Sequence, residues 1–125
     1  MIALDASAVL ALLMREPGHQ IVAAAVDDSC VSAVNCAEVL ERLTRGGQDV
    51  EEVRRMLHYA PWEVVPFDLT EAAETARLAP LTRLAGLSLG DRACLALARM
   101  RNIPALTADR AWLDVNVGVE VQVIR

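Results

Sequence analysis

Lysine is missing from this chain of 125 residues, and all twelve of its basic residues are arginine. The absence excludes a phosphate-binding loop of the GxxxxGK[ST] type, in which a lysine contacts the nucleotide phosphates. It also excludes enzymes that bind their substrate through a lysine Schiff base. Seventeen acidic residues give a formal net charge of −5, the opposite of the basic balance that is usual for a nucleic-acid-binding domain.

Cysteines and aromatic residues are scarce. The three cysteines include no CxxC pair, which argues against a disulfide framework or a zinc site and favours buried thiols in a reducing cytoplasm. With two tryptophans, one tyrosine and one phenylalanine, the core must consist mainly of small aliphatic side chains. The apolar N-terminal segment has no basic residue and is interrupted by Asp5, so we expect neither a signal peptide nor a membrane span.

Short apolar runs alternate with helical patterns along the whole chain, and the length suits a single domain over residues 1–125. We expect about five short strands, at 2–4, 30–32, 62–67, 105–107 and 119–124. Helices are predicted at 6–14, 19–26, 35–45, 50–59, 70–84 and 88–101, with a short helical turn at 110–113. Pro80 is expected to kink or split the fifth of these helices. The alternation predicts an α/β fold with a mainly parallel sheet covered on both faces.

Four acidic residues occupy comparable places in this scheme. Asp5 and Asp109 each follow a predicted strand, while Glu38 and Asp91 lie in the first turns of predicted helices. The carboxyl ends of parallel strands meet at one edge of a sheet, and ligands bind there where the strand order reverses. We therefore expect all four carboxylates to line one crevice.

Each acid also has a purely structural interpretation. Two helix starts fit the capping box, in which a polar N-cap residue is followed three positions later by an acid. These boxes would pair Asn35 with Glu38 and Ser88 with Asp91. Asp5 and Asp109 fit single N-caps, and Glu38 is also spaced to pair with Arg42 on the next helical turn.

Caps have no reason to cluster, and clustered carboxylates repel one another unless a cation neutralises them. Hard divalent cations such as Mg²⁺ prefer carboxylate and water oxygens. No histidine or cysteine stands beside the four acids, so zinc and iron fit poorly. A Mg²⁺ site, or a Mn²⁺ site in its place, suits phosphodiester hydrolysis by an activated water, and no persuasive side-chain nucleophile competes with that interpretation.

Four segments that contain these acids carry a family resemblance: 2–8, 31–39, 87–96 and 106–112. They resemble the motif blocks of PIN-domain ribonucleases, and most closely those of VapC-type toxins from prokaryotic toxin–antitoxin pairs. The resemblance covers essentially the whole chain. It implies a three-layer α/β/α fold and a Mg²⁺- or Mn²⁺-dependent endoribonuclease. It further implies that a small antitoxin protein silences the enzyme and that the enzyme forms a homodimer.

By position, Asp5 and Asp91 match the family's principal metal-binding carboxylates. Glu38 and Asp109 match the two remaining acids, which bind metal directly or through water. Two further positions are expected to support the ligands: Ser7 matches a small hydroxyl residue near the first acid, and Asn35 matches a polar position in the second block. Cys36 and Gly90 stand where other residues are common in the family.

The arginines have two interpretations. Arg92 and Arg110 each follow one of the four acids, so either could contact RNA phosphate or hold a neighbouring carboxylate. Four more arginines form either a basic strip beside the crevice or an ordinary ion-paired helix surface, because glutamates alternate with them. These are Arg42, Arg45, Arg54 and Arg55.

Three hypotheses follow. The first is a metal-dependent endoribonuclease toxin that acts on RNA and binds an antitoxin. The second is a non-catalytic interaction module whose acids only cap helices. The third is a metal-dependent phosphohydrolase that acts on a small substrate. It ranks last because a phosphoaspartyl hydrolase usually has a second aspartate two residues after the first, where this chain has Ser7. The sequence leaves open which RNA is cut and whether one or two ions bind.

Overall fold

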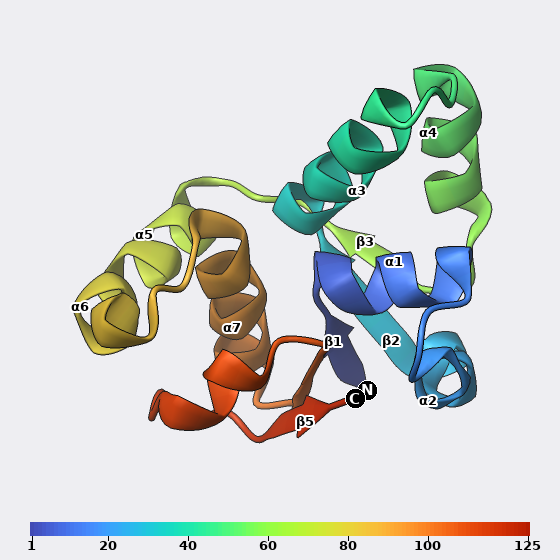
Figure 1. The fold of residues 1–125 in the computed structure, drawn as a ribbon. Helices are drawn as coiled ribbons and strands as arrows, with labels where there is room; N and C mark the ends of the chain where they lie inside the picture. Colours follow the sequence, from blue (N-terminus) through green and yellow to red (C-terminus); the bar gives the residue numbers. More distant parts are fainter.

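A computed structural model describes all 125 residues and is built around one sheet (Figure 1). Its five strands are all parallel and run in the order β3-β2-β1-β4-β5. The strands are β1 (Ile2–Leu4), β2 (Ser29–Ser32), β3 (Glu63–Val65), β4 (Ala105–Thr107) and β5 (Val121–Val123). The predicted parallel sheet of about five short strands is confirmed, although β3 and β5 are shorter than the predicted runs.

Seven α-helices and three short 3₁₀ helices connect the strands. The α-helices are α1 (Ala6–Met14), α2 (His19–Ala25), α3 (Ala33–Arg45), α4 (Val50–Tyr59), α5 (Leu69–Arg77), α6 (Ala79–Thr82) and α7 (Leu89–Arg101). The 3₁₀ helices are η1 (Val26–Asp28), η2 (Arg83–Ala85) and η3 (Arg110–Asp114). The predicted helix over 70–84 is split, with Pro80 in the first turn of α6, where its missing N–H has no partner to lose.

The start of α3 differs from the prediction. Ser32, not Asn35, is the N-cap, and its hydroxyl accepts a 3.2 Å hydrogen bond from the Val34 N–H. The helix therefore begins directly after β2. Asn35 lies within its first turn and is fully buried, so the capping box predicted for Asn35 and Glu38 is wrong.

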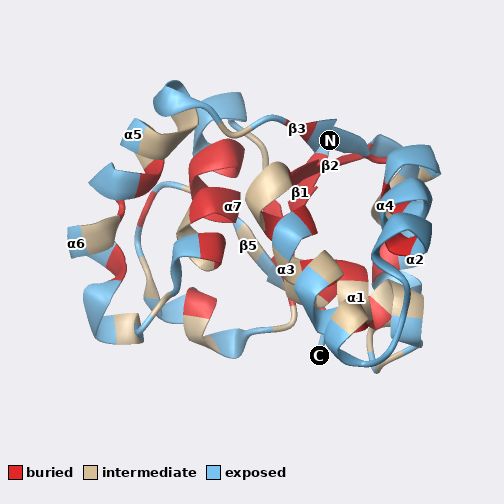
Figure 2. Ribbon diagram, turned by 90° about the horizontal axis from the view of Figure 1, so that it is seen from above, coloured by how far each residue is buried: buried red, intermediate tan, exposed pale blue.

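Alternating side chains of the strands divide the core into two layers. Ile2 and Leu4 belong to a cluster with α1, α2, α3 and α4, while Ala3 points to the opposite face and packs with α7. Figure 2 shows buried residues on the central strands and along α7, with exposed outer turns on α4, α5 and α6. The fold is therefore the three-layer α/β/α arrangement expected above.

Small side chains line the contact between α7 and the sheet. Ala93, Cys94 and Ala98 on the helix are buried in the same cluster as Ala3 and Ala105 on the strands. Burial raises the pKa of the Cys94 thiol, as expected for an unreactive core cysteine. No helix in the structure is both long and apolar enough to cross a bilayer.

The strand order reverses between β1 and β4. The chain leaves β1 toward β2 and β3 on one side and later returns to form β4 and β5 on the other side. Parallel α/β sheets bind ligands at such a switch point, beyond the carboxyl ends of the strands. Asp5 follows β1 and Asp109 lies two residues beyond β4, so both stand at this position.

Candidate metal centre

An open cleft of about 340 Å³ lies at the carboxyl edge of the sheet. All four acids predicted from the sequence line it, together with six other residues. Its lining is Asp5, Ala6, Ser7, Leu10, Glu38, Glu41, Arg42, Arg45, Asp91 and Asp109. The carboxylates thus come from the end of β1, from α3, from the first turn of α7 and from the segment after β4.

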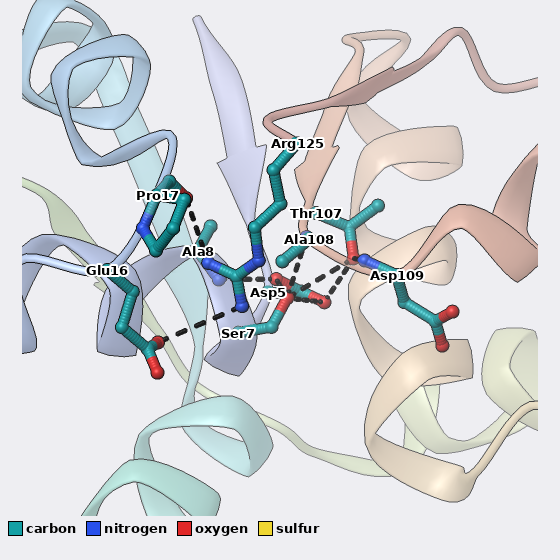
Figure 3. A network of polar contacts seen from close by, with 9 residues as sticks. All are labelled: Asp5, Ser7, Ala8, Glu16, Pro17, Thr107, Ala108, Asp109 and Arg125. Carbon is teal, nitrogen blue, oxygen red and sulfur yellow. Dashed lines mark hydrogen bonds and ion pairs between the residues drawn. The ribbon is translucent and has the colours of Figure 1, made fainter.

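Asp5 is the most buried of the four, with 3% of its surface exposed. It caps α1 by accepting a 2.8 Å hydrogen bond from the Ala8 N–H on Oδ1. The Ser7 hydroxyl lies 2.7 Å from Oδ1 and 2.9 Å from Oδ2 and donates to this carboxylate. Figure 3 shows these donors converging on Asp5. Both carboxylate oxygens are therefore held in a fixed orientation.

Thr107 completes this network, and sequence reasoning missed it. Its fully buried hydroxyl donates a 2.6 Å hydrogen bond to Asp5 Oδ2 and accepts a 3.0 Å bond from the Asp109 N–H. The cause is the register of β1 and β4: Leu4 pairs with Leu106, so the next residues of the two strands are neighbours. The sequence did contain one signal: Thr107, a hydroxyl residue, ends the predicted strand 105–107. The pairing of that strand with β1 places the hydroxyl beside Asp5.

Ser7 bridges the same two segments. Besides donating to Asp5, its oxygen accepts a 2.8 Å hydrogen bond from the Ala108 N–H. It also lies 3.3 Å from the Thr107 hydroxyl. The serine therefore lies beside the first acid, at the place where the sequence predicts a supporting hydroxyl, and it ties the start of α1 to the segment after β4.

Burial is the main influence on the ionisation of Asp5. Removal from water raises the pKa of this carboxyl to about 6, and the nearby charge of Asp91 adds to the rise. Hydrogen bonds from Thr107, Ser7 and the Ala8 N–H oppose the increase. The site thus holds a carboxylate whose charge lacks a neutralising partner within the chain.

Glu38 reaches the cleft from α3 by lying over the first turn of α7. The Asn35 side-chain amide donates a 2.7 Å bond to Glu38 Oε1 and a 3.0 Å bond to the Gly90 carbonyl. A Cβ at position 90 would overlap the Glu38 carboxylate, so the glycine leaves the space that this carboxylate occupies. Partial burial raises the pKa of Glu38, against the effect of the Asn35 bond. The predicted ion pair between Glu38 and Arg42 does not form.

Asp91 and Asp109 both act as caps, as their structural interpretations predicted. Asp91 Oδ2 accepts from the Ser88 N–H at 2.9 Å in a capping box at the start of α7. Asp109 Oδ1 accepts a 3.0 Å bond from the Ala111 N–H at the start of η3. In each case only one oxygen is used, and the second accepts no hydrogen bond within the chain. A cap therefore leaves each carboxylate one oxygen for a ligand.

The donor set fits a hard divalent cation. It consists of carboxylates with hydroxyl support, and Glu38, Asp91 and Asp109 each keep one oxygen without a hydrogen bond. No three acidic, histidine or cysteine side chains are already arranged to hold an ion. For Asp109, Figure 3 shows why: its carboxylate is directed away from that of Asp5. Binding would therefore require side-chain rotation of the exposed carboxylates around the fixed Asp5.

The model of the PIN domain family matches residues 2–118 of the chain. This chain belongs to the PIN domain family. The resemblance read from the four sequence segments is thereby confirmed at the level of the family. No curated protein sequence matches the chain.

Several solved structures share this PIN fold at low sequence identity. A toxin–antitoxin complex from Klebsiella pneumoniae has a TM-score of 0.77 and 17% identity over 100% of this chain and 98% of that chain. A DNA-bound VapBC complex from Salmonella typhimurium has a TM-score of 0.76 and 17% identity over 100% of both chains. VapC20 from Mycobacterium tuberculosis, described as a toxin that cleaves the sarcin–ricin loop, has a TM-score of 0.74 and 16% identity over 96% and 99% of the two chains.

The arginines of this PIN domain divide into two groups. Arg92 donates to the Thr75 carbonyl at 3.3 Å and Arg110 to the Arg125 carbonyl at 3.4 Å, and neither lines the cleft. The expectation that either one holds a neighbouring carboxylate is wrong, whereas a contact with RNA phosphate stays a prediction. Arg42 and Arg45, in contrast, line the cleft.

Proposed function

We propose that this PIN domain is a Mg²⁺- or Mn²⁺-dependent endoribonuclease that hydrolyses RNA phosphodiester bonds. The observation that carries the proposal is the convergence of Asp5, Glu38, Asp91 and Asp109 on one cleft at the switch point of the sheet. These acids come from four separate elements, and helix capping alone gives no reason for them to meet. Membership in the PIN family, which includes nucleases, supports the same activity.

Asp5 and Asp91 would hold the cation, with Glu38 and Asp109 bound to it directly or through water. When bound, such an ion supplies the activation of a water molecule and the neutralisation of charge at the phosphate. The chain's own contribution is orientation. Thr107, Ser7 and the Ala8 N–H fix the Asp5 carboxylate, and Asn35 holds Glu38 against α7.

We further propose that the enzyme is the toxin of a toxin–antitoxin pair. Support comes from the fold neighbours, which include chains of toxin–antitoxin complexes matched over 98% and 100% of those chains. An antitoxin protein would then be the partner that silences the cleft, and the toxin would act as a cytoplasmic homodimer. A basic side chain is the chemistry by which such a partner would recognise four clustered carboxylates.

Incubation of the purified protein with cellular RNA tests the activity. We expect cleavage with Mn²⁺, none with EDTA, and a loss of cleavage in Asp5→Asn and Asp91→Asn. Asp49→Asn is a matched control, because Asp49 caps α4 by accepting from the Glu52 N–H but lies outside the cleft. Full activity in both cleft variants would contradict the proposal, and mapping of the cut sites would identify the RNA.

A second candidate has an observation of its own. Asp5, Asp91 and Asp109 do cap helices, and no preformed group of three ligands is present. A non-catalytic interaction module would show these same contacts. Such a module would cut no RNA, and divalent cations would leave its stability unchanged.

A further inference from the structure

Two arginines continue the cleft outward from the carboxylates. Arg42 and Arg45 lie four and seven residues after Glu38 on α3, which places them on the same side of the helix as Glu38. Both line the cleft with the acids, and both also line an adjoining hollow of about 280 Å³ with Gly46. The carboxylates and the arginines therefore form one continuous surface rather than two separate sites.

These guanidinium groups are poorly neutralised within the chain. Arg42 makes no ion pair, and Arg45 has only a distant one, 4.0 Å from Glu41 with both side chains at least 70% exposed. Exposed pairs of this kind contribute little binding energy. The other arginines of the predicted basic strip behave differently: Arg54 is paired with Glu51 at 2.8 Å, and Arg55 lines neither hollow. Of the four arginines, only Arg42 and Arg45 therefore line the cleft with guanidinium groups that are poorly neutralised.

Guanidinium groups with free donors bind phosphate in a bidentate manner. An RNA strand that is cut at the carboxylates must extend out of the cleft on both sides of the cut bond. On one side, the strand would pass the cationic side chains of α3. An acidic protein segment is the other polyanion that could use them. The RNA strand is favoured because the arginines directly adjoin the acids at which its phosphodiester bond would be cut.

We propose that Arg42 and Arg45 bind backbone phosphates of the RNA strand next to the hydrolysed bond. This inference rests on the proposed nuclease function and assigns its substrate-binding surface. Both arginines also lie in the last turn of α3, where a positive charge interacts favourably with the helix dipole and stabilises the helix. A purely structural role of this kind would change thermal stability but not RNA binding, so the two roles can be measured separately.

The test measures binding of a short fluorescein-labelled single-stranded RNA of mixed sequence by anisotropy. It uses the Asp5→Asn/Asp91→Asn background in EDTA, in which repulsion is reduced and the RNA is not cut. Each lost phosphate contact lowers the salt dependence of binding to a single strand by about 0.7 in log–log slope. Arg42→Ala/Arg45→Ala should therefore lower the slope by about 1.4 and weaken binding by about tenfold or more.

The matched control is Arg55→Ala/Arg99→Ala, which removes the same charge from exposed positions outside both hollows. It should leave the slope close to that of the parent, and Arg42→Lys/Arg45→Lys should keep most of it. Equal losses in the control and the cleft variant would overturn the inference, as would an RNA that does not bind the parent. Binding of labelled polyglutamate that Arg42→Ala/Arg45→Ala abolishes, with no effect of the same change on RNA binding, would assign the arginines to an acidic protein partner and overturn it as well.

The cleavage assay separates this inference from the proposed function. Suppose that the wild-type protein, with its acids intact, cuts RNA. If the arginine variants then bind and cut RNA normally, the function stands and the inference fails. If RNA binding depends on the arginines but Mn²⁺ never produces cleavage, the inference about binding stands and the nuclease proposal fails. Thermal melting of each variant confirms that the fold is retained.

Discussion

The Thr107 hydroxyl donates a 2.6 Å hydrogen bond to the Asp5 carboxylate, although 102 positions separate the two residues in the chain. The parallel pairing of β1 with β4 produces this contact. It joins the two strands at the point where the sheet reverses its order, and it aims a buried carboxylate into the cleft. Much of the expected behaviour of the protein depends on this buried group.

Removal of the Thr107 hydroxyl should destabilise the metal-free protein. Thr107→Val keeps the side-chain shape but leaves Asp5 Oδ2 without its shortest donor and the Asp109 N–H without its acceptor. An unsatisfied buried polar group costs about 1–3 kcal/mol, so the free energy of unfolding in EDTA should fall by about that amount. Urea denaturation measures it, and Thr107→Ser is the control that keeps a hydroxyl. Wild-type stability in the valine variant would show that the bond has no energetic role.

The metal-free protein should lose stability as the pH rises through about 6. Asp5 has a pKa of about 6 in the folded state and 3.8 as its ordinary value, so the folded state binds the proton more tightly. The stabilisation is complete below pH 3.8 and is lost as the carboxyl ionises. Relative to Asp5→Asn, the loss by neutral pH should be about 3 kcal/mol. Urea denaturation of both proteins in EDTA across this range measures the difference, and parallel pH profiles would contradict the expectation.

Divalent cations should reverse this loss. A ligand that binds only the folded state at about 100 times its dissociation constant adds about 2.7 kcal/mol. Mn²⁺ should therefore raise the melting temperature of the wild type by several degrees and leave Asp5→Asn/Asp91→Asn unaffected. The cap variant Asp49→Asn should respond like the wild type. An unchanged melting temperature in the wild type would favour the non-catalytic module instead.

A side chain at position 90 should displace Glu38 without unfolding the protein. Gly90→Ala places a Cβ where the Glu38 carboxylate lies, and the flexible glutamate can rotate away. Alanine also favours the helix by about 0.5–1 kcal/mol, so the melting temperature should not fall. The affinity for Mn²⁺ should fall by about tenfold, the scale seen when supports of a metal ligand are removed.

The Glu38→Ala background provides the control for this prediction. There, Gly90→Ala should have no further effect on Mn²⁺ affinity, because the carboxylate it displaces is already absent. Titration of Mn²⁺ by calorimetry measures all four proteins of the cycle. Additive losses in the double variant would mean that Gly90 acts through something other than Glu38.

Local patterns predicted most of the fold. Neighbouring residues determine the succession of strands and helices along the chain, the capping box of Ser88 with Asp91 and the break near Pro80. These features could therefore be predicted from the sequence. The error at Asn35 arose from the same source, since Ser32 and Asn35 are both good N-caps. The end of β2 decided between them by bringing the chain into α3 at Ser32.

The sequence by itself determined the parallel α/β class and the four acids at strand ends and helix starts. Only the tertiary structure decided that Thr107 holds Asp5, that Gly90 makes room for Glu38, and that Arg42 and Arg45 face the cleft while Arg92 and Arg110 do not. The physical reason is the range of the interactions. Caps and periodicity act within a few residues, whereas strand register and helix packing bring together side chains up to about a hundred positions apart.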